Sequence, residues 1–242
     1  MAFVFEQTIT DCFTSAGDGN TMTSWSPQAD EILLLCVVVR APTTAVSNVA
    51  GNGLTWTQVR DVDNARDVMG VTVFRASSGS TPSTGSITFD HNTSLTVFAM
   101  AVRISGGDRS TTDGVEADSG APGGDPDNND MLVDITTLTD NALVVGMGGQ
   151  RGNRNFDPGS DETEEFESSG DCNSGGDRIR GNIWFKTTPV TPIGTHELGQ
   201  LNSWNTSVAW SCVGLSLKPV AAGGLSIAVA MNSYRQRHQS IV

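Results

Sequence analysis

Short segments rich in β-branched and aromatic residues run along this chain of 242 residues, and each is bounded by Gly, Pro, Asn, Asp or Ser. Such spacing is typical of strands joined by turns. We expect strands at residues 32–39, 55–59, 71–75, 86–89, 95–104, 143–147, 182–186, 196–198 and 208–217. No amphipathic helical pattern interrupts the series, so the sequence predicts an all-β protein, either a sandwich or a barrel.

The second part of the chain resembles the first part at an offset of 109 to 113 residues. Four pairs of segments match in the same order along the chain: 30–39 with 140–149, 71–77 with 182–188, 84–89 with 193–198, and 92–105 with 205–218. We therefore predict two sequence-related halves, 29–105 and 131–219, joined by an acidic linker at 106–130. A repeat of this length is too long for a solenoid.

Two architectures fit this repeat: two tandem sandwiches, or one jelly-roll-like β-sandwich whose two sheets interlock strands from both halves. We favour the interlocked sandwich over 29–219, because the open edge of an isolated five-stranded half invites aggregation. The segment 95–104 is apolar at both alternate sets of positions, which predicts a strand covered on both faces, at the centre or under a neighbouring subunit. Residues 1–28 are expected to form an extended N-terminal arm with a first strand, and residues 220–242 an extended C-terminal arm.

The net charge of −13 comes from two segments alone. Residues 106–130 hold seven acids and one arginine, residues 156–171 hold seven acids and no base, and the rest of the chain is balanced. We expect two acidic loops that face solvent or receive arginines from a neighbouring subunit. This charge argues against nucleic acid as a partner, because phosphate binding depends on Lys and Arg.

The N-terminus has no basic region, and its apolar stretch is broken at Glu6, so no signal peptide is predicted. The longest apolar run, 32–39, is too short to span a bilayer, which needs about 20 residues. We therefore expect synthesis in the cytoplasm and no membrane partner. No C-x-x-C spacing joins the four cysteines, Cys12, Cys36, Cys172 and Cys212. Without a secretory signal they are expected to be buried free thiols; otherwise three pairings are open.

Residues with catalytic chemistry are scarce. His91, His196 and His238 lack a Ser or Cys context such as G-x-S-x-G, and no metal-ligand or phosphate-loop spacing is present. We therefore predict no catalytic residue, no cofactor and no enzyme activity. A glycan hydrolase is kept as a third alternative, because carboxylates are abundant, although they cluster in polar loops where no burial is expected to raise a pKa.

The sequence also contains two features that are candidates for ligand binding. Asp125, Asp127 and Asn129 are spaced like the start of a calcium loop, but the Gly at position six and the acid at position twelve of an EF-hand are absent. Trp25 and Trp204 lie in expected loops and are candidates for a sugar-binding face. The remaining tryptophans occupy expected strands, where core packing is the default: Trp56, Trp184 and Trp210.

The C-terminal arm has an apolar run, LSIAVAM, followed by a stretch with two arginines and no acid. Consecutive apolar residues are costly to leave in water, so we expect this arm to dock on another surface. The candidate partner-binding residues are Leu225, Ile227, Val229, Met231, Tyr234, Arg235 and Arg237.

The succession DEILLLCVVVRAP, NGLTWTQV, GVTVFRASS, TGSITF, VFAMAVRISGGD, TDNALVVGMGG and WSCVGLSLKP resembles the duplicated β-sandwich domain of tailed-bacteriophage virion proteins, over residues 30–219. The resemblance implies a structural or adhesive role with no catalytic residues. It predicts a homo-oligomeric capsid cement or decoration protein on the outer capsid surface, which stabilises the head by bridging major capsid proteins. The alternative is a tail or surface adhesin that binds host glycans.

Overall fold

Alternating and fully apolar segments form β-strands throughout the described part of the chain. The computed structural model describes residues 2–14, 17–40, 46–63, 69–91, 96–110, 114–123, 130–151, 155, 157–167, 172, 178–200 and 209–221. Its strands are β1 (Val4–Phe13), β2 (Gly17–Thr21), β3 (Ile32–Val39), β4 (Val46–Gly51), β5 (Thr57–Asp63), β6 (Gly70–Ser77), β7 (Ile87–His91), β8 (Val97–Ser105), β9 (Val115–Gly123), β10 (Met131–Thr136), β11 (Leu143–Arg151), β12 (Glu162–Glu167), β13 (Ile179–Lys186), β14 (Thr195–Gln200) and β15 (Trp210–Leu217). The predicted all-β class is confirmed, and no helix in the described part is long and apolar enough to cross a membrane.

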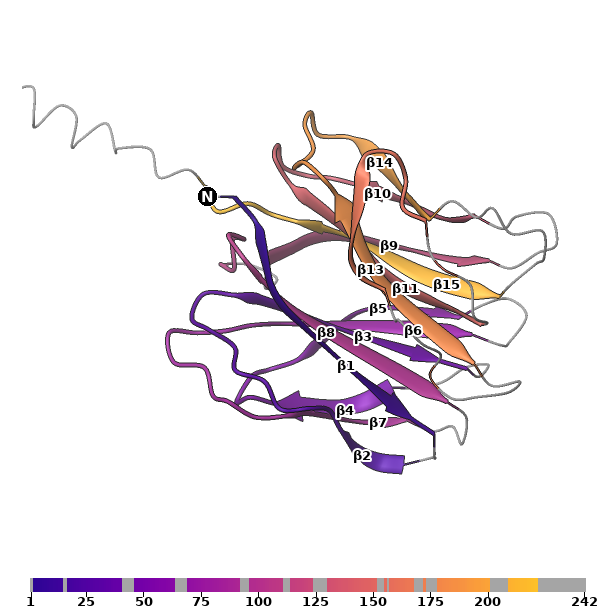
Figure 1. Cartoon of the computed structure of the whole chain (residues 1–242). Coiled ribbons are helices and arrows are strands. Elements are labelled where there is room, and N and C mark those ends of the chain that lie inside the picture. The colour runs from indigo at the N-terminus through magenta and orange to yellow at the C-terminus, as the bar shows by residue number, and fades with distance from the viewer. Residues whose placement is uncertain are drawn as a thin grey trace, which may run out of the picture.

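The strands form four antiparallel sheets stacked in layers (Figure 1). From the first layer to the last, the strand orders are β2-β7-β4, β1-β8-β3-β6-β5, β12-β13-β11-β15-β9 and β10-β14. The first two sheets take all their strands from β1–β8, and the last two from β9–β15. The expectation that the sheets interlock strands of both halves is therefore wrong. Each half is its own jelly-roll-like sandwich, because strands close in sequence pair at a lower cost in chain entropy.

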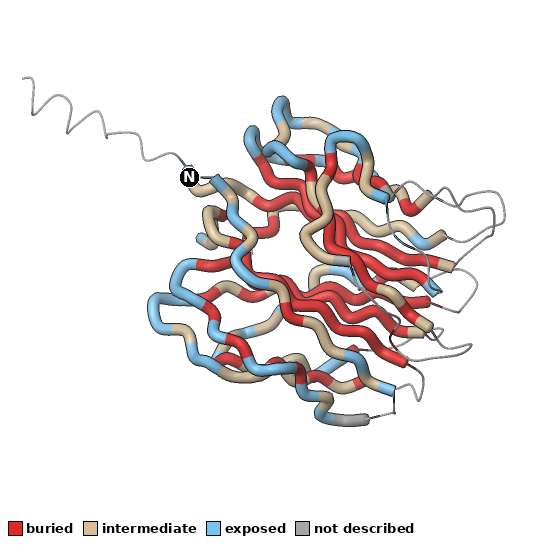
Figure 2. Tube along the Cα trace, viewed as in Figure 1, coloured by how far each residue is buried: buried red, intermediate tan, exposed pale blue. Residues whose placement is uncertain are grey.

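Three apolar cores separate the four layers. On β3, Leu34 and Cys36 face the central core between the two five-stranded sheets, whereas Leu33 and Leu35 face the three-stranded sheet. The predicted two-face coverage of 95–104 is confirmed for the described residues of β8, which lies between β1 and β3 in its sheet. Figure 2 shows the buried residues gathered in the two middle sheets. The two middle sheets are thus covered on both faces.

The two halves have the same strand order. The strand order β5-β6-β3-β8-β1 in the first five-stranded sheet corresponds, position by position, to β12-β13-β11-β15-β9 in the second. Both outermost pairs carry a β-bulge at the same place, after Gln58 in β5 and after Glu164 in β12. The outer pair β10-β14 corresponds to β2-β7, but no described strand corresponds to β4. Among the described strands, the outer layer of the second half therefore has two strands where that of the first half has three.

Side-chain direction corrects part of the expected alignment between the halves. Even-numbered residues of β3 face the central core, whereas odd-numbered residues of β11 do so. The sequence match of 30–39 with 140–149 pairs even-numbered residues with even-numbered residues, so it aligns core-facing residues of β3 with residues of β11 that face away from the central core. This match is therefore displaced by one residue from the structural alignment, and so is the match of 71–77 with 182–188. The other two matches align residues that face the same side in both halves. A shift of one residue moves every side chain to the opposite face, so sheet packing fixes this register.

The expected arms and linker also differ from the structure. Within 1–28, β1 and β2 are edge strands of two sheets, so the described residues there belong to the sandwich body. Within the expected linker 106–130, β9 pairs with β15 along its length. Residues 222–242 of the expected C-terminal arm lie outside the described residues.

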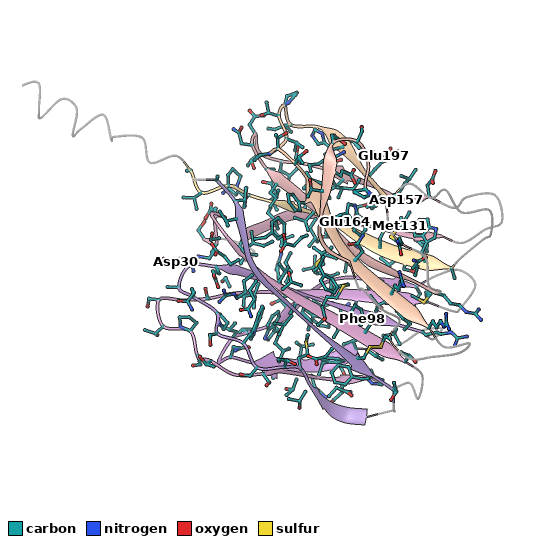
Figure 3. All side chains as sticks on the ribbon, viewed as in Figure 1. Asp30, Phe98, Met131, Asp157, Glu164 and Glu197 are labelled. Atoms are coloured by element: carbon teal, nitrogen blue, oxygen red, sulfur yellow. A yellow bond between two sulfur atoms is a disulfide. The ribbon has the colours of Figure 1, made fainter. Side chains whose placement is uncertain are left out.

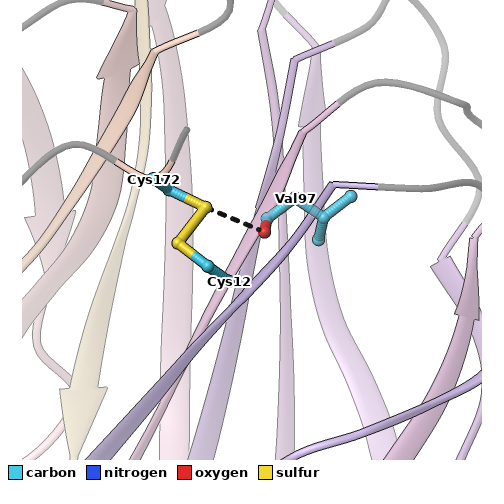
Figure 4. Close-up of a disulfide and its surroundings, with 3 residues drawn as sticks. All are labelled: Cys12, Val97 and Cys172. Atoms are coloured by element: carbon cyan, nitrogen blue, oxygen red, sulfur yellow. Dashed lines mark hydrogen bonds between the residues drawn. A yellow bond between two sulfur atoms is a disulfide. The ribbon is translucent and has the colours of Figure 1, made fainter. Parts of the chain in front are cut away.

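A disulfide joins the two halves. Cys12 on β1 bonds to Cys172, which follows β12, with an S–S distance of 2.17 Å (Figure 4). The same two sheets also touch through the stacked rings of Phe5 on β1 and Phe185 on β13, whose centroids are 4.4 Å apart. The free-thiol expectation is therefore wrong for these two cysteines, because residues far apart in sequence meet only when the sheets stack.

The free-thiol expectation is confirmed for Cys36 and Cys212, which are buried and unbonded. Burial raises the pKa of both thiols far above the usual range, so both stay neutral.

Candidate functional site

A polar cavity of about 430 Å³ lies in the second half, between the turn before β12, the end of β13 and β14. Its charged and titratable lining residues are Asp161, Glu162, Lys186, His196 and Glu197, and its apolar lining residues are Leu132 and Val190. Figure 3 labels Glu197 on β14, above the face of the second five-stranded sheet.

A buried ion pair forms the floor of this cavity. Glu162 and Lys186 are register partners on β12 and β13, and each residue is only 9% exposed. Lys186 Nζ lies 3.0 Å from Glu162 Oε1, and 2.9 and 3.0 Å from the two carboxylate oxygens of Asp161. The Gly199 amide donates to both Glu162 oxygens, at 3.0 and 3.1 Å. These contacts fix the groups in one geometry.

The environment shifts three pKa values. Burial raises the pKa of Glu162, against the opposing effect of hydrogen bonds from Lys186 and Gly199. Burial also acts to lower the pKa of Lys186, but its bonds to Asp161 and Glu162 outweigh burial and raise it. The hydrogen bond from Lys186 lowers the pKa of Asp161. We take Glu162 as ionised at neutral pH, because its oxygens accept three hydrogen bonds and face an ammonium group.

The first half offers an internal comparison for this pair. Gln58 lies opposite Phe74 on the first pair of strands, and Glu164 lies opposite Trp184 on the second. Continuing two residues along each strand places Trp56 and Ala76 where the second half has Glu162 and Lys186. Trp56 and Ala76 are apolar and pack in the outer core of the first half. The buried ion pair is therefore a departure from the apolar packing of the equivalent position.

His196 and Glu197 on β14 also line the cavity. No described group hydrogen-bonds to the buried Nε2 of His196. Glu197 is exposed, and its register partner across the two-stranded sheet is Asp134, which is also exposed. Like charges placed directly opposite one another are destabilising in a sheet, so this pair brings no stability to the fold.

Only some of the residues singled out from the sequence as candidate binding or catalytic residues lie in the described part of the chain. Trp25, expected on a sugar-binding face, is instead buried, and its indole N–H donates to Asn52 Oδ1 at 2.9 Å. Its burial reflects cover by the three-stranded sheet, which sequence alone did not show. Trp184 and Trp210 are buried, as expected. Several candidates lie outside the described residues: Trp204, His238, Asp125, Asp127, Asn129, Leu225, Ile227, Val229, Met231, Tyr234, Arg235 and Arg237.

The two acidic segments are not simply solvated loops. Asp118 on β9 pairs with Arg60 on β5 at 2.6 Å, and Asp108 pairs with Lys218 at 2.9 Å. Hydrogen bonds from Ser110 and Lys218 lower the pKa of Asp108 strongly. No described group of three His, Cys, Asp or Glu residues is arranged to hold a metal ion.

Sequence reasoning did not find the cavity. One signal was present: the chain has only two lysines, and Lys186 follows an apolar segment that lies next to the second acidic segment in the fold. The pairing of β12 with β13, which brings the charges together, has no signature in residue spacing. Glu162 is also an acid whose pKa is raised by burial, where a solvated loop was expected.

Comparisons with protein-family models, curated proteins and solved structures found no match to this chain.

Proposed function

We propose that this protein is a structural component of a tailed-phage particle, a decoration protein on the outer capsid surface that bridges major capsid proteins. The sequence resemblance described above motivates the proposal. A rigid body suits such a role, because a bridge must hold its geometry while it is loaded. The proposed partners are the major capsid protein and further copies of this chain.

The disulfide between Cys12 and Cys172 is the observation that carries the proposal. Disulfides persist in oxidising surroundings, including virion and cell surfaces, and are rare in the cytosol. A bond across the stacked halves suits a protein that is made in the host cytoplasm and works outside the cell. It links residues 160 positions apart and so prevents the halves from separating in a free particle.

The proposed contact surface for a partner is the tip of β10 and β14. Leu138 and Ile193 are 57% and 53% exposed and extend the ladder of these strands. The Thr137 amide donates to the Gly194 carbonyl at 2.9 Å, and the Ile193 amide donates to Asp140 at 3.1 Å. These bonds hold the exposed apolar side chains in place. Specific bridging requires further contacts, because stable interfaces bury about 1,000 Å² or more.

The test is the position of the protein on a phage particle that contains it, determined by imaging and by deletion. The proposal predicts density on the head, and fragile heads with normal adsorption when the gene is deleted. Removal of residues 220–242 is expected to abolish incorporation while the sandwich stays folded. Density at the tail, or lost adsorption with intact heads, contradicts the proposal and supports an adhesin.

A further inference from the structure

We propose that the cavity beside Lys186 is a binding site for a short saccharide, whose hydroxyl groups donate to Asp161 and Glu197. This inference is independent of the proposed position on a virion. It rests on the cavity, on the buried ion pair that forms its floor, and on the different packing at the equivalent position of the first half.

The floor of the cavity is built before any ligand arrives. Glu162 and Lys186 are nine-tenths buried, and the Gly199 amide fixes the Glu162 carboxylate. A buried ion pair seldom stabilises a fold more than an apolar pair of similar volume. The first half has that apolar alternative in Trp56 and Ala76. The second half therefore holds a costly arrangement that folding alone does not require.

The lining selects the class of ligand. An anion is disfavoured, because Asp161, Glu162 and Glu197 outnumber the single ammonium of Lys186. A cationic ligand is disfavoured for Asp161 and Glu162, because Lys186 already provides their counterion at 2.9 to 3.0 Å. A purely apolar ligand would leave these charges without hydrogen-bond donors.

A neutral ligand with several hydroxyl donors and aliphatic C–H groups meets the remaining requirements. The side chain of Asp161 is 69% exposed, so its oxygens accept further bonds beyond those from Lys186. Glu197 offers a second carboxylate at the same cavity. Leu132 and Val190 provide apolar surface for the C–H groups. A volume of about 430 Å³ lies within the range of small-molecule sites, and these features describe a saccharide.

The test uses the full chain and ligand-observed NMR with a panel of free hexoses, pentoses, deoxyhexoses, N-acetylhexosamines and their short oligosaccharides. L-Argininamide is included as a cationic probe. We expect at least one saccharide to bind. The variant Glu197→Gln is expected to weaken that binding by about tenfold or more, because one charged acceptor is lost. Its thermal unfolding should match the parent, since Glu197 is exposed.

The matched control is Asp134→Asn, which changes the opposing carboxylate of the same strand pair but does not line the cavity. Unchanged saccharide affinity in this variant supports the assignment. The proposal is overturned if no saccharide in the panel binds, or if both variants bind as the parent does. It is also overturned if only L-argininamide binds and Glu197→Gln weakens that binding, which would assign the cavity to a cation.

Discussion

Replacing Cys12 and Cys172 together by serine is expected to lower the free energy of unfolding by about 5 kcal/mol. The bond closes a loop with a sequence separation of 160 residues. The chain-entropy relation gives about 5 kcal/mol at 25 °C for a loop of this size. Whole domains are stable by only about 5 to 15 kcal/mol, so this single bond is a large share of the total. The two halves would then be held by the central core and surface pairs alone.

The assay is equilibrium unfolding in guanidinium chloride, followed by tryptophan fluorescence and circular dichroism. The midpoint of the double variant is expected to fall on the order of 1 M below that of the oxidised parent, given the slopes of guanidinium unfolding. The parent treated with a reductant should unfold with the variant. As a control, the same reductant should leave the variant unchanged, because Cys36 and Cys212 are unbonded.

Two results would refute this reasoning. Mass spectrometry of alkylated protein that finds four free thiols after exposure to air would show that the bond does not form. A double variant within about 1 kcal/mol of the oxidised parent would show that the loop constraint contributes little. In that case the unfolded chain keeps the two cysteines near each other without the bond.

Three further predictions concern the second half. Lys186→Met should destabilise the fold by about 3 to 5 kcal/mol in chemical unfolding, because Glu162 stays buried without its counterion, and Glu162→Gln should restore part of the loss in the double variant. Gly146→Ala should cost about 1 to 3 kcal/mol in the same assay, since its Cβ would lie 2.2 Å from Trp184, whereas Gly79→Ala meets nothing within 4 Å and should be neutral. The raised pKa of Lys186 means that its stabilisation is complete below its ordinary value of 10.5 and is lost as pH rises through the raised value. The parent should therefore lose more stability between neutral and strongly alkaline pH than Lys186→Met; equal losses would contradict this.

Much of the strand pattern was predictable from residue type. The apolar segment of β3 and the turn residues that bound it predict a strand by local rules. The apolar residues at both alternate sets of positions in β8 predict cover on both faces. The candidate site was not predictable in this way. Lys186 and Glu162 are 24 residues apart, and only the pairing of β12 with β13 brings them into contact.

The sequence by itself determined that the chain forms β-strands, and roughly where, because alternation and turn residues act over a few positions. Only the tertiary structure decided that each half closes as its own sandwich, that Cys12 meets Cys172, and that one equivalent position holds Trp56 and Ala76 while the other holds an ion pair. These outcomes depend on which faces stack, and a shift of one residue in register reverses every face. Long-range packing therefore fixed the features to which we assign function.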